Sequence, residues 1–247
     1  RVASGFGGVP DVGIWVMTAF HSDRFYLAFD TSGSIGSVAV AQGGEVMARI
    51  VLTERAAHAS RLIPAIDEVL EEAGLDREEV AGIVVGEGPG SFTGVRVAAA
   101  TAKGLIYGWK CPLWAISSLA ATALALDGGG IRYVLFDARG DRVYGACYGI
   151  GRIGVETLVP PHGGSLRDVL DAEVPPGSIF LGDGADRHRA AIVGAGFEVA
   201  PEPATHPTAD ALLRYLALHP DTQAVEAVKD WEPRYIREWQ PDKAWKG

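Results

Sequence analysis

The sequence predicts an α/β protein made of two similar lobes, each with the element order βββαβαβα. Two observations carry this prediction. Strand-like apolar segments alternate with amphipathic helical segments, and their order is the same in both halves of the chain. In addition, Leu27–Thr31 (LAFDT) resembles Val134–Ala138 (VLFDA) near the start of the second half. A repeat of this length is too long for a solenoid, so we expect two lobes that face each other across a cleft.

The first half opens with a short apolar strand that ends in an aspartate. A hairpin signal, Gln42–Glu45, separates two alternating segments. An amphipathic helix then ends at Gly74, and a continuous apolar strand leads into a glycine-rich loop. The expected elements are strands Phe25–Asp30, Gly36–Ala41, Val46–Leu52, Val80–Gly86 and Leu113–Ile116, and helices Arg61–Ala73, Gly94–Gly108 and Ser118–Leu126.

The second half repeats this order after a glycine run, Asp127–Gly130, which we interpret as a hinge between lobes. Its first strand also ends in an aspartate. The expected elements are strands Tyr133–Asp137, Arg142–Tyr148, Val155–Val159, Ser178–Leu181 and Phe197–Ala200, and helices Leu166–Leu170, Asp186–Val193 and Ala209–Leu218. We therefore expect a first lobe at 25–127 and a second lobe at 128–247. Residues 1–24, which are weakly patterned and contain the first methionine, Met17, are expected to form a leader outside the fold.

The element order is that of the actin-like and Hsp70-like (ASKHA) two-lobed fold, with a parallel βαβα part and antiparallel hairpins at one side of each sheet. In such a fold the aspartates that end the first strands face the cleft, where carboxylates can hold a hydrated Mg²⁺ on nucleotide phosphates. An ordinary turn, in which the Asp and Ser side chains satisfy local backbone groups, is the alternative. The candidate nucleotide-cleft residues are Asp30, Thr31, Ser32, Asp137, Gly182, Asp183 and Gly184.

The most distinctive segment is the loop Gly86–Gly94 (GEGPGSFTG), which joins a buried strand to a helix N-terminus. Free amides there favour an anion, but no lysine follows the glycines as in a P-loop, and Pro89 breaks a dinucleotide-binding pattern. The simpler interpretation is a tight turn from strand to helix, with Ser91 or Thr93 as the helix N-cap.

The next helix carries Gly94, Ala98 and Ala102 at four-residue spacing. This small-residue face would allow close approach either of the chain's own sheet or of another chain, and the sequence leaves both open. Arg96 and Lys103 lie near a different face, which is typical of a solvated surface.

Composition limits the function classes. The chain has 247 residues, 48% of them hydrophobic and 21% charged, which excludes wholesale disorder. The net charge of −9 argues against broad binding to nucleic-acid backbone. No apolar run approaches the ~18 residues of a membrane span. The two cysteines and six histidines form no metal-binding or nucleophile pattern, so we expect a cytoplasmic protein with no catalytic residues and no metal site of its own.

The segment Gly88–Arg96 (GPGSFTGVR) is similar to the TsaB (YeaZ) family of bacterial tRNA threonylcarbamoyladenosine biosynthesis. The resemblance covers roughly residues 25–240, and its other motifs are Phe29–Ser32, His58 with Arg61–Pro64, Ile116–Leu119, Asp137–Arg139 with Val143–Tyr144, Leu181–Ala185 and Pro233–Arg237. It implies the same two-lobed fold. It also implies a non-catalytic scaffold subunit that pairs with TsaD, its catalytic relative, and with the ATPase TsaE. That assembly transfers a threonylcarbamoyl group to N6 of adenosine 37 in tRNA.

The resemblance further implies that the chain has no intrinsic cofactor, that ATP and Mg²⁺ act only within the complex, and that tRNA is met through the complex. TsaD holds a metal with two histidines, and Ser118 and Thr122 occupy the corresponding places here, which cannot replace imidazoles. The partner surface, for a homodimer or for TsaD, is expected on the first-lobe helices. Its candidate residues are His58, Arg61, Leu62, Ile66, Gly94, Arg96, Ala98, Ala102 and Lys103.

Two other functions compete with the scaffold. An independent ATP-dependent phosphotransferase is motivated by the two aspartates and the two-lobed fold, and it requires that the isolated chain bind Mg-ATP. A peptidase ranks last, because the sequence offers neither a metal site nor a nucleophile–base pair.

Overall fold

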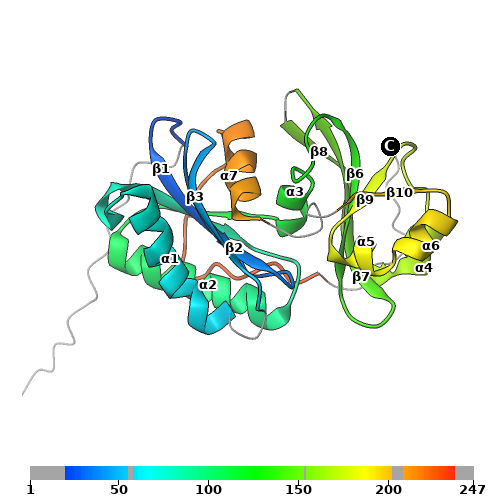
Figure 1. Cartoon of the computed structure of the whole chain (residues 1–247), viewed down its shortest axis with the longest axis horizontal. Coiled ribbons are helices and arrows are strands. Elements are labelled where there is room, and N and C mark those ends of the chain that lie inside the picture. Colours follow the sequence, from blue (N-terminus) through cyan, green and yellow to red (C-terminus); the bar gives the residue numbers. More distant parts are fainter. Residues whose placement is uncertain (1–19, 55–57, 153, 202–207, 237–247) are drawn as a thin grey trace, which may run out of the picture.

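The computed structural model describes residues 20–54, 58–152, 154–201 and 208–236. They form two five-stranded sheets with helices around and between them (Figure 1). The elements of the first half are β1 (Phe25–Asp30), β2 (Gly36–Gln42), β3 (Glu45–Leu52), α1 (His58–Ala73), the 3₁₀ turn η2 (Arg77–Glu79), β4 (Val80–Gly86), α2 (Phe92–Trp109), β5 (Leu113–Ile116) and α3 (Ser118–Thr122). Those of the second half are β6 (Gly130–Asp137), β7 (Arg142–Gly151), β8 (Gly154–Ser165), α4 (Leu166–Asp171), β9 (Ile179–Leu181), α5 (Asp183–Arg187), α6 (Arg189–Gly194), β10 (Glu198–Val199) and α7 (Ala209–Leu218).

The two sheets have the same topology. The strand orders are β3-β2-β1-β4-β5 and, read in the matching direction, β8-β7-β6-β9-β10. In both, the first three strands pair antiparallel and the remaining strands add in parallel. This internal repeat confirms the predicted α/β fold of two actin-like (ASKHA) lobes.

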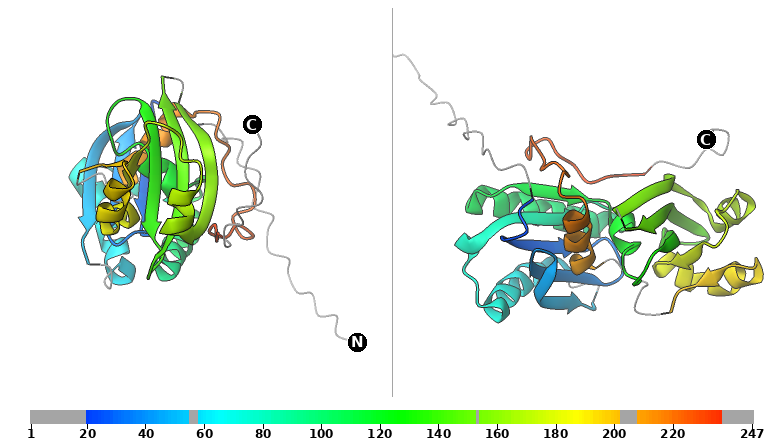
Figure 2. Two further views of the ribbon diagram at one scale, coloured as in Figure 1. Left: turned by 90° about the vertical axis from the view of Figure 1, so that its right-hand side faces the viewer. Right: turned by 90° about the horizontal axis from the view of Figure 1, so that it is seen from above.

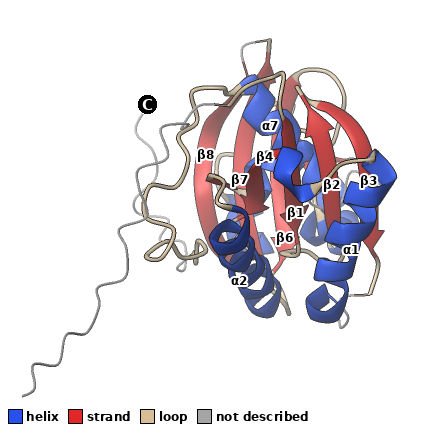
Figure 3. Cartoon of the chain, turned by 90° about the vertical axis from the view of Figure 1, so that its left-hand side faces the viewer, coloured by secondary structure: helices blue, strands red, loops and turns tan. Residues whose placement is uncertain are grey.

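Helices cover the sheets on both faces. α1 and α2 lie side by side on one face of the first sheet (Figure 3), where a core cluster that includes Leu62, Ile66, Ala98 and Ala102 buries them. α4, α5 and α6 cover the outer face of the second sheet through Val169, Ala185 and Ile192. Burial of this apolar surface is the main stabilising contribution to each lobe.

The last helix of each half packs on the other half's sheet. Leu119 and Ala120 of α3 join the core of the second sheet, whereas Leu212 and Leu216 of α7 join the core of the first. α3 and α7 consequently lie between the sheets (Figure 1).

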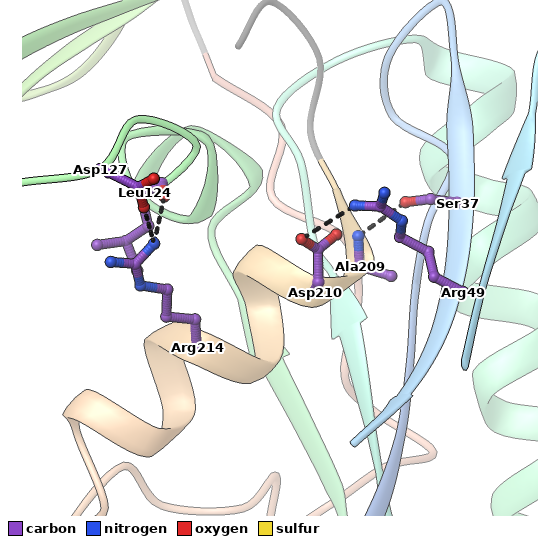
Figure 4. Close-up of polar contacts among 7 residues, drawn as sticks. All are labelled: Ser37, Arg49, Leu124, Asp127, Ala209, Asp210 and Arg214. Atoms are coloured by element: carbon purple, nitrogen blue, oxygen red, sulfur yellow. Dashed lines mark hydrogen bonds and ion pairs between the residues drawn. The ribbon is translucent and has the colours of Figure 1, made fainter. Parts of the chain in front are cut away.

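Figure 4 shows how α7 is anchored at its start and at its middle. At its start, the Ala209 amide donates to Ser37 Oγ at 2.7 Å, and Asp210 pairs with Arg49 of β3 at 3.3 Å. One turn later, Arg214 donates to the carbonyl of Leu124, just after α3, at 3.2 Å.

The chain after α7 returns along the first lobe as an extended segment, residues 220–236, which we call the C-terminal strap (Figure 2). The Val225 amide donates to the Leu113 carbonyl at 2.7 Å, and the Arg234 amide donates to the Glu87 carbonyl at 2.9 Å. Our boundary prediction placed 128–247 in the second lobe, but α7 and the strap pack with the first lobe because their apolar side chains complete its two cores.

Other boundaries shift for local reasons. α3 ends at Thr122, not at Leu126, and the expected helix 186–193 is two short helices, α5 and α6, that meet at His188. The expected hinge is shorter, because Gly130 already belongs to β6. Of the expected leader, 1–19 lies outside the described residues, whereas Phe20 packs against Tyr26 of β1 with ring centroids 4.7 Å apart.

Candidate functional site

The prediction that the small residues of α2 form the partner surface is wrong, because those residues face the chain's own sheet. Gly94, Ala98 and Ala102 are buried, and the two alanines have 0% exposure within the chain's own core. Of the two alternatives that the spacing allowed, packing on the chain's own sheet is the one that occurs. Small residues are needed there because the helix lies close to β1. A Cβ on Gly94 would overlap the Thr31 carbonyl.

Three of the α1 residues predicted for the partner face are also buried. Leu62 and Ile66 belong to the same core as Ala98, and His58 Nε2 lies 3.3 Å from the Leu52 carbonyl oxygen. Arg61 is exposed, but its guanidinium makes a double hydrogen bond to Glu68 at 3.1 and 3.2 Å.

The opposite face of α2 presents a second set of small residues to solvent. Ala100, Gly104 and Gly108 are exposed at four-residue spacing, and a Cβ on either glycine would meet nothing within 4 Å. Tyr107 on α2 is 54% exposed and Ile63 on α1 is 45% exposed. Sequence reasoning missed this outer face, although its residues have the same four-residue spacing as the buried set and lie six positions further along the chain.

The C-terminal strap contacts Arg96 and Lys103, the two cationic side chains of α2 that the sequence analysis assigns to the partner surface. Arg96 Nε donates to Tyr235 Oη at 2.9 Å, and its guanidinium lies 3.9 Å from the centre of the Phe92 ring. Lys103 Nζ donates to the Lys229 carbonyl at 3.1 Å, with its ammonium 5.9 Å from the Trp231 ring. These cations therefore fix the strap to α2.

Asp30, at the end of β1, is fully enclosed. Its side chain has 0% exposure, Ser118 Oγ donates to Oδ2 at 2.6 Å, and the Ser32 amide donates to Oδ1 at 2.7 Å. Gly86 lies against the carboxylate so closely that a Cβ would overlap it. Burial raises the pKa of the Asp30 carboxyl above its ordinary value, and the hydrogen bonds from Ser118 and Ser32 oppose that rise.

The glycine-rich loop after β4 covers the residues that follow Asp30. Thr31 Oγ1 donates to the Gly94 carbonyl at 2.7 Å, and the Ser91 amide donates to the Ser32 carbonyl at 2.7 Å. Gly90 lies against Ser32 where any side chain would collide. The glycines therefore serve close backbone packing, and Ser91 caps α2 as the simpler interpretation predicted.

The second lobe repeats this arrangement. The turn Gly182–Gly184 packs on the end of β6, and Asp183 Oδ1 accepts from the Asp137 amide at 2.9 Å. Asp137 Oδ2 accepts from Arg187 Nη1 at 2.7 Å, and Oδ1 accepts from the Arg139 amide at 2.8 Å. Gly182, with φ 102°, is required because a side chain would collide with the Leu135 carbonyl.

These residues do not fit the Mg²⁺-nucleotide site that the fold implies. A hydrated Mg²⁺ needs carboxylate oxygens that are open to the cleft, but both Asp30 oxygens accept internal hydrogen bonds and Asp137 is paired with an arginine. Ser118 and Thr122 are also buried and engaged, since Thr122 Oγ1 donates to the Ser118 carbonyl at 2.8 Å. Within the described residues, no cluster of three or more potential metal ligands occurs, and no helix is long and apolar enough to cross a membrane.

A cavity of about 320 Å³ opens where the two lobes meet. Its lining comes from the start of α2 on one side and from the turn between β6 and β7 on the other, and consists of Gly90, Ser91, Phe92, Thr93, Asp137, Ala138, Arg139 and Tyr144. We call this cavity the cleft mouth. Sequence reasoning selected only Asp137 of these residues as a site residue.

Comparison with known proteins identifies the family. A family model described as "TsaD: tRNA N6-adenosine threonylcarbamoyltransferase" matches residues 45–195. The chain is 32% identical over 171 residues to the tRNA threonylcarbamoyladenosine biosynthesis protein TsaB of Bacillus subtilis, an alignment that covers 67% of this chain and 74% of that protein. The chain belongs to the TsaB (YeaZ) family.

Two further matches agree. The TsaB protein of Haemophilus influenzae is 46% identical over 99 residues, which is 40% of this chain and 42% of that protein. The solved structure of YeaZ from Pseudomonas aeruginosa superimposes with a TM-score of 0.70 at 27% identity, covering 86% of this chain and all of that one. The two-lobed architecture is therefore that of the TsaB family over nearly the whole described chain.

Proposed function

We propose that this TsaB-family chain is a non-catalytic subunit of tRNA N6-threonylcarbamoyladenosine synthesis, which docks to a TsaD-type catalytic partner and activates it. The names of the relatives supply the process. The observation that carries the non-catalytic role is the enclosed Asp30, whose two oxygens are held by Ser118 and by the Ser32 amide. A carboxylate enclosed in this way stabilises the fold and is not accessible to a nucleotide phosphate or its metal ion.

The docking surface in this proposal is the outer face of α1 and α2. Exposed small residues, Ala100, Gly104 and Gly108, allow a partner helix to approach closely, and Tyr107 and Ile63 supply apolar contact beside them. The match to a TsaD family model across 45–195 supports a relative of the same fold as occupant, because related folds often pair through equivalent faces.

The other partners follow from the same role. A second copy of this chain competes with TsaD for the α1–α2 face, TsaE joins as the ATPase, and tRNA enters through the assembled complex. ATP and Mg²⁺ act within that complex, which works in the cytoplasm. The independent phosphotransferase alternative requires Mg-ATP binding by the isolated chain, and titration calorimetry of the chain with Mg-ATP is expected to give no binding heat.

Complex formation with purified TsaD tests the docking surface. Gly104→Phe places a ring on the open side of α2, so we expect it to abolish the complex on size exclusion chromatography while the chain stays folded. Gly194→Phe, on α6 of the second lobe, is the matched control, because a Cβ there also meets nothing within 4 Å. An intact complex with folded Gly104→Phe, or equal loss with the control, would contradict this surface.

A further inference from the structure

The cleft mouth combines cationic, aromatic and open backbone amide groups that have no part in the docking proposed above. It is formed by both lobes, with the start of α2 on one side and the β6–β7 turn on the other. Its volume of about 320 Å³ is at the lower end of the range for small-ligand sites. It is distinct from the outer α1–α2 face described above.

Two arginines near this cavity lack acidic partners. Among the described residues, no carboxylate pairs with Arg96 or with Arg139, although the protein as a whole carries a net charge of −9. Arg139 lines the cavity, and its backbone is held in the left-handed region (φ 72°) by the hydrogen bond from its amide to Asp137. The Asp137 charge is already compensated by Arg187.

Flat aromatic surface lies beside these cations. Phe92 lines the cavity and is 59% exposed, and Tyr235 of the C-terminal strap is 46% exposed with its ring centroid 5.9 Å from that of Phe92. The Arg96 guanidinium, 3.9 Å from the Phe92 ring centre, holds the aromatic pair in place. Tyr144 of β7 lines the opposite side of the cavity.

The same wall favours negative charge. The amides of Phe92 and Thr93 belong to the first turn of α2, an 18-residue helix, where amides have no acceptor within the helix. Such a turn attracts phosphate groups, and Arg139 across the cavity adds a full positive charge.

We propose that the cleft mouth binds a nucleotide of single-stranded RNA, with its base against Phe92 and a phosphate between Arg139 and the first turn of α2. Aromatic rings next to arginines, together with a local anion site, are the features by which proteins hold unpaired nucleotides. The inference rests on the proposed function in one respect, that the process supplies an RNA substrate. It adds that this chain contacts the RNA directly.

A protein partner is disfavoured at this point for a physical reason. A stable protein interface needs an extended apolar centre that excludes water, whereas the exposed apolar groups here are two rings flanked by charges and open backbone amides. The acidic remainder of the chain restricts RNA contact to this site, because it repels the phosphate backbone elsewhere.

The test measures RNA affinity in the complex of full-length chain and TsaD by fluorescence anisotropy of a labelled, unmodified anticodon stem-loop RNA. Phe92→Ala should raise Kd about 5- to 150-fold, the range for loss of one base stacked on an aromatic ring. Phe92→Tyr should restore the affinity because it keeps the ring. Arg139→Ala should raise Kd and reduce the slope of log Kd against log salt by about 0.7. Arg77→Ala, a distant exposed arginine, is the charge control.

The outcomes separate this inference from the function on which it rests. Wild-type affinity in folded Phe92→Ala and Arg139→Ala would overturn the RNA site, while a complex that still needs the chain for tRNA modification would leave the scaffold role intact. If these variants instead lose TsaD on size exclusion and keep RNA affinity, the cleft mouth is a protein contact and the inference is wrong. If the complex modifies tRNA equally well without the chain, the proposed function fails whatever the RNA affinity.

Discussion

Replacing Gly86 by alanine tests whether Asp30 is a buried structural group. Gly86 ends β4 with no positive φ, so its backbone accepts any residue. The nearest obstacle is the Asp30 carboxylate, which a Cβ at residue 86 would overlap. The substitution therefore forces the carboxylate away from Ser118 Oγ and the Ser32 amide, which now donate to it at 2.6 and 2.7 Å.

The size of the effect follows from these two bonds. A hydrogen bond to a charged group contributes about 1.5–3 kcal/mol, so the loss of both costs about 3–6 kcal/mol. Alanine in a strand is favoured over glycine by about 0.5–1 kcal/mol, which offsets part of this loss. We expect Gly86→Ala to lower the free energy of unfolding by about 2–5 kcal/mol.

Urea unfolding followed by circular dichroism measures this change, and a double-mutant cycle identifies its cause. In an Asp30→Ala background the obstacle is gone, so Gly86→Ala should then cost nothing or stabilise slightly. Gly149→Ala on β7 is the matched control, because its Cβ would meet only ordinary contacts with Leu158 from 3.6 Å. Equal cost of Gly86→Ala in both backgrounds would refute the contact with Asp30 as the cause.

Three further predictions use the same unfolding assay. Ala98→Phe should destabilise the chain by about 1–3 kcal/mol, because Ala98 is in the core; unchanged stability would place it on a free surface. Burial lowers the pKa of His162 below its ordinary 6.5, so as the pH falls the unfolded chain takes up the proton before the folded chain does. The free energy of unfolding should therefore be highest above about pH 6.5 and decrease below it, and His162→Gln should reduce that decrease. An unchanged pH profile in the variant would exclude His162 as the source of the decrease. Arg214→Ala removes the hydrogen bond between α7 and the Leu124 carbonyl and should lower the free energy of unfolding by about 0.5–1.5 kcal/mol. A loss of several kcal/mol would contradict this expectation, which treats Arg214 as a half-exposed side chain with a modest contribution.

The repeated topology was predictable because it depends on hydrophobic periodicity, which the sequence carries in both halves. The strands around Phe29 and Phe136 occupy the same central position in their sheets, as the similarity of their sequences indicates. Helix ends were less predictable. The helix expected at 186–193 divides at His188, which no local signal marks.

The candidate site was harder to predict, because its burial is a tertiary property. Four-residue spacing identified Gly94, Ala98 and Ala102 as a close-packing face, but spacing alone does not say whether the sheet or a partner lies opposite, and the exposed set at Ala100 was overlooked. The position of Asp30 at the end of a strand likewise predicts a carboxylate that faces the cleft. Only the structure shows that Ser118 Oγ and the Ser32 amide already occupy its oxygens.

The C-terminal strap was missed for a different reason. Residues 220–236 follow neither a helical nor a strand period, so no pattern indicates that they return to α2. Trp231 and Tyr235 are the residues that could have signalled it, since large aromatic side chains outside regular elements commonly mark packing or binding.

The rate of threonylcarbamoyl transfer to unmodified tRNA, in a reaction with purified TsaD, TsaE, ATP and threonylcarbamoyl adenylate, tests the central claim most directly. The scaffold account predicts modified adenosine when this chain or its Gly194→Phe control is added, and none when the chain is omitted or replaced by Gly104→Phe. Equal rates with and without the chain would contradict the account.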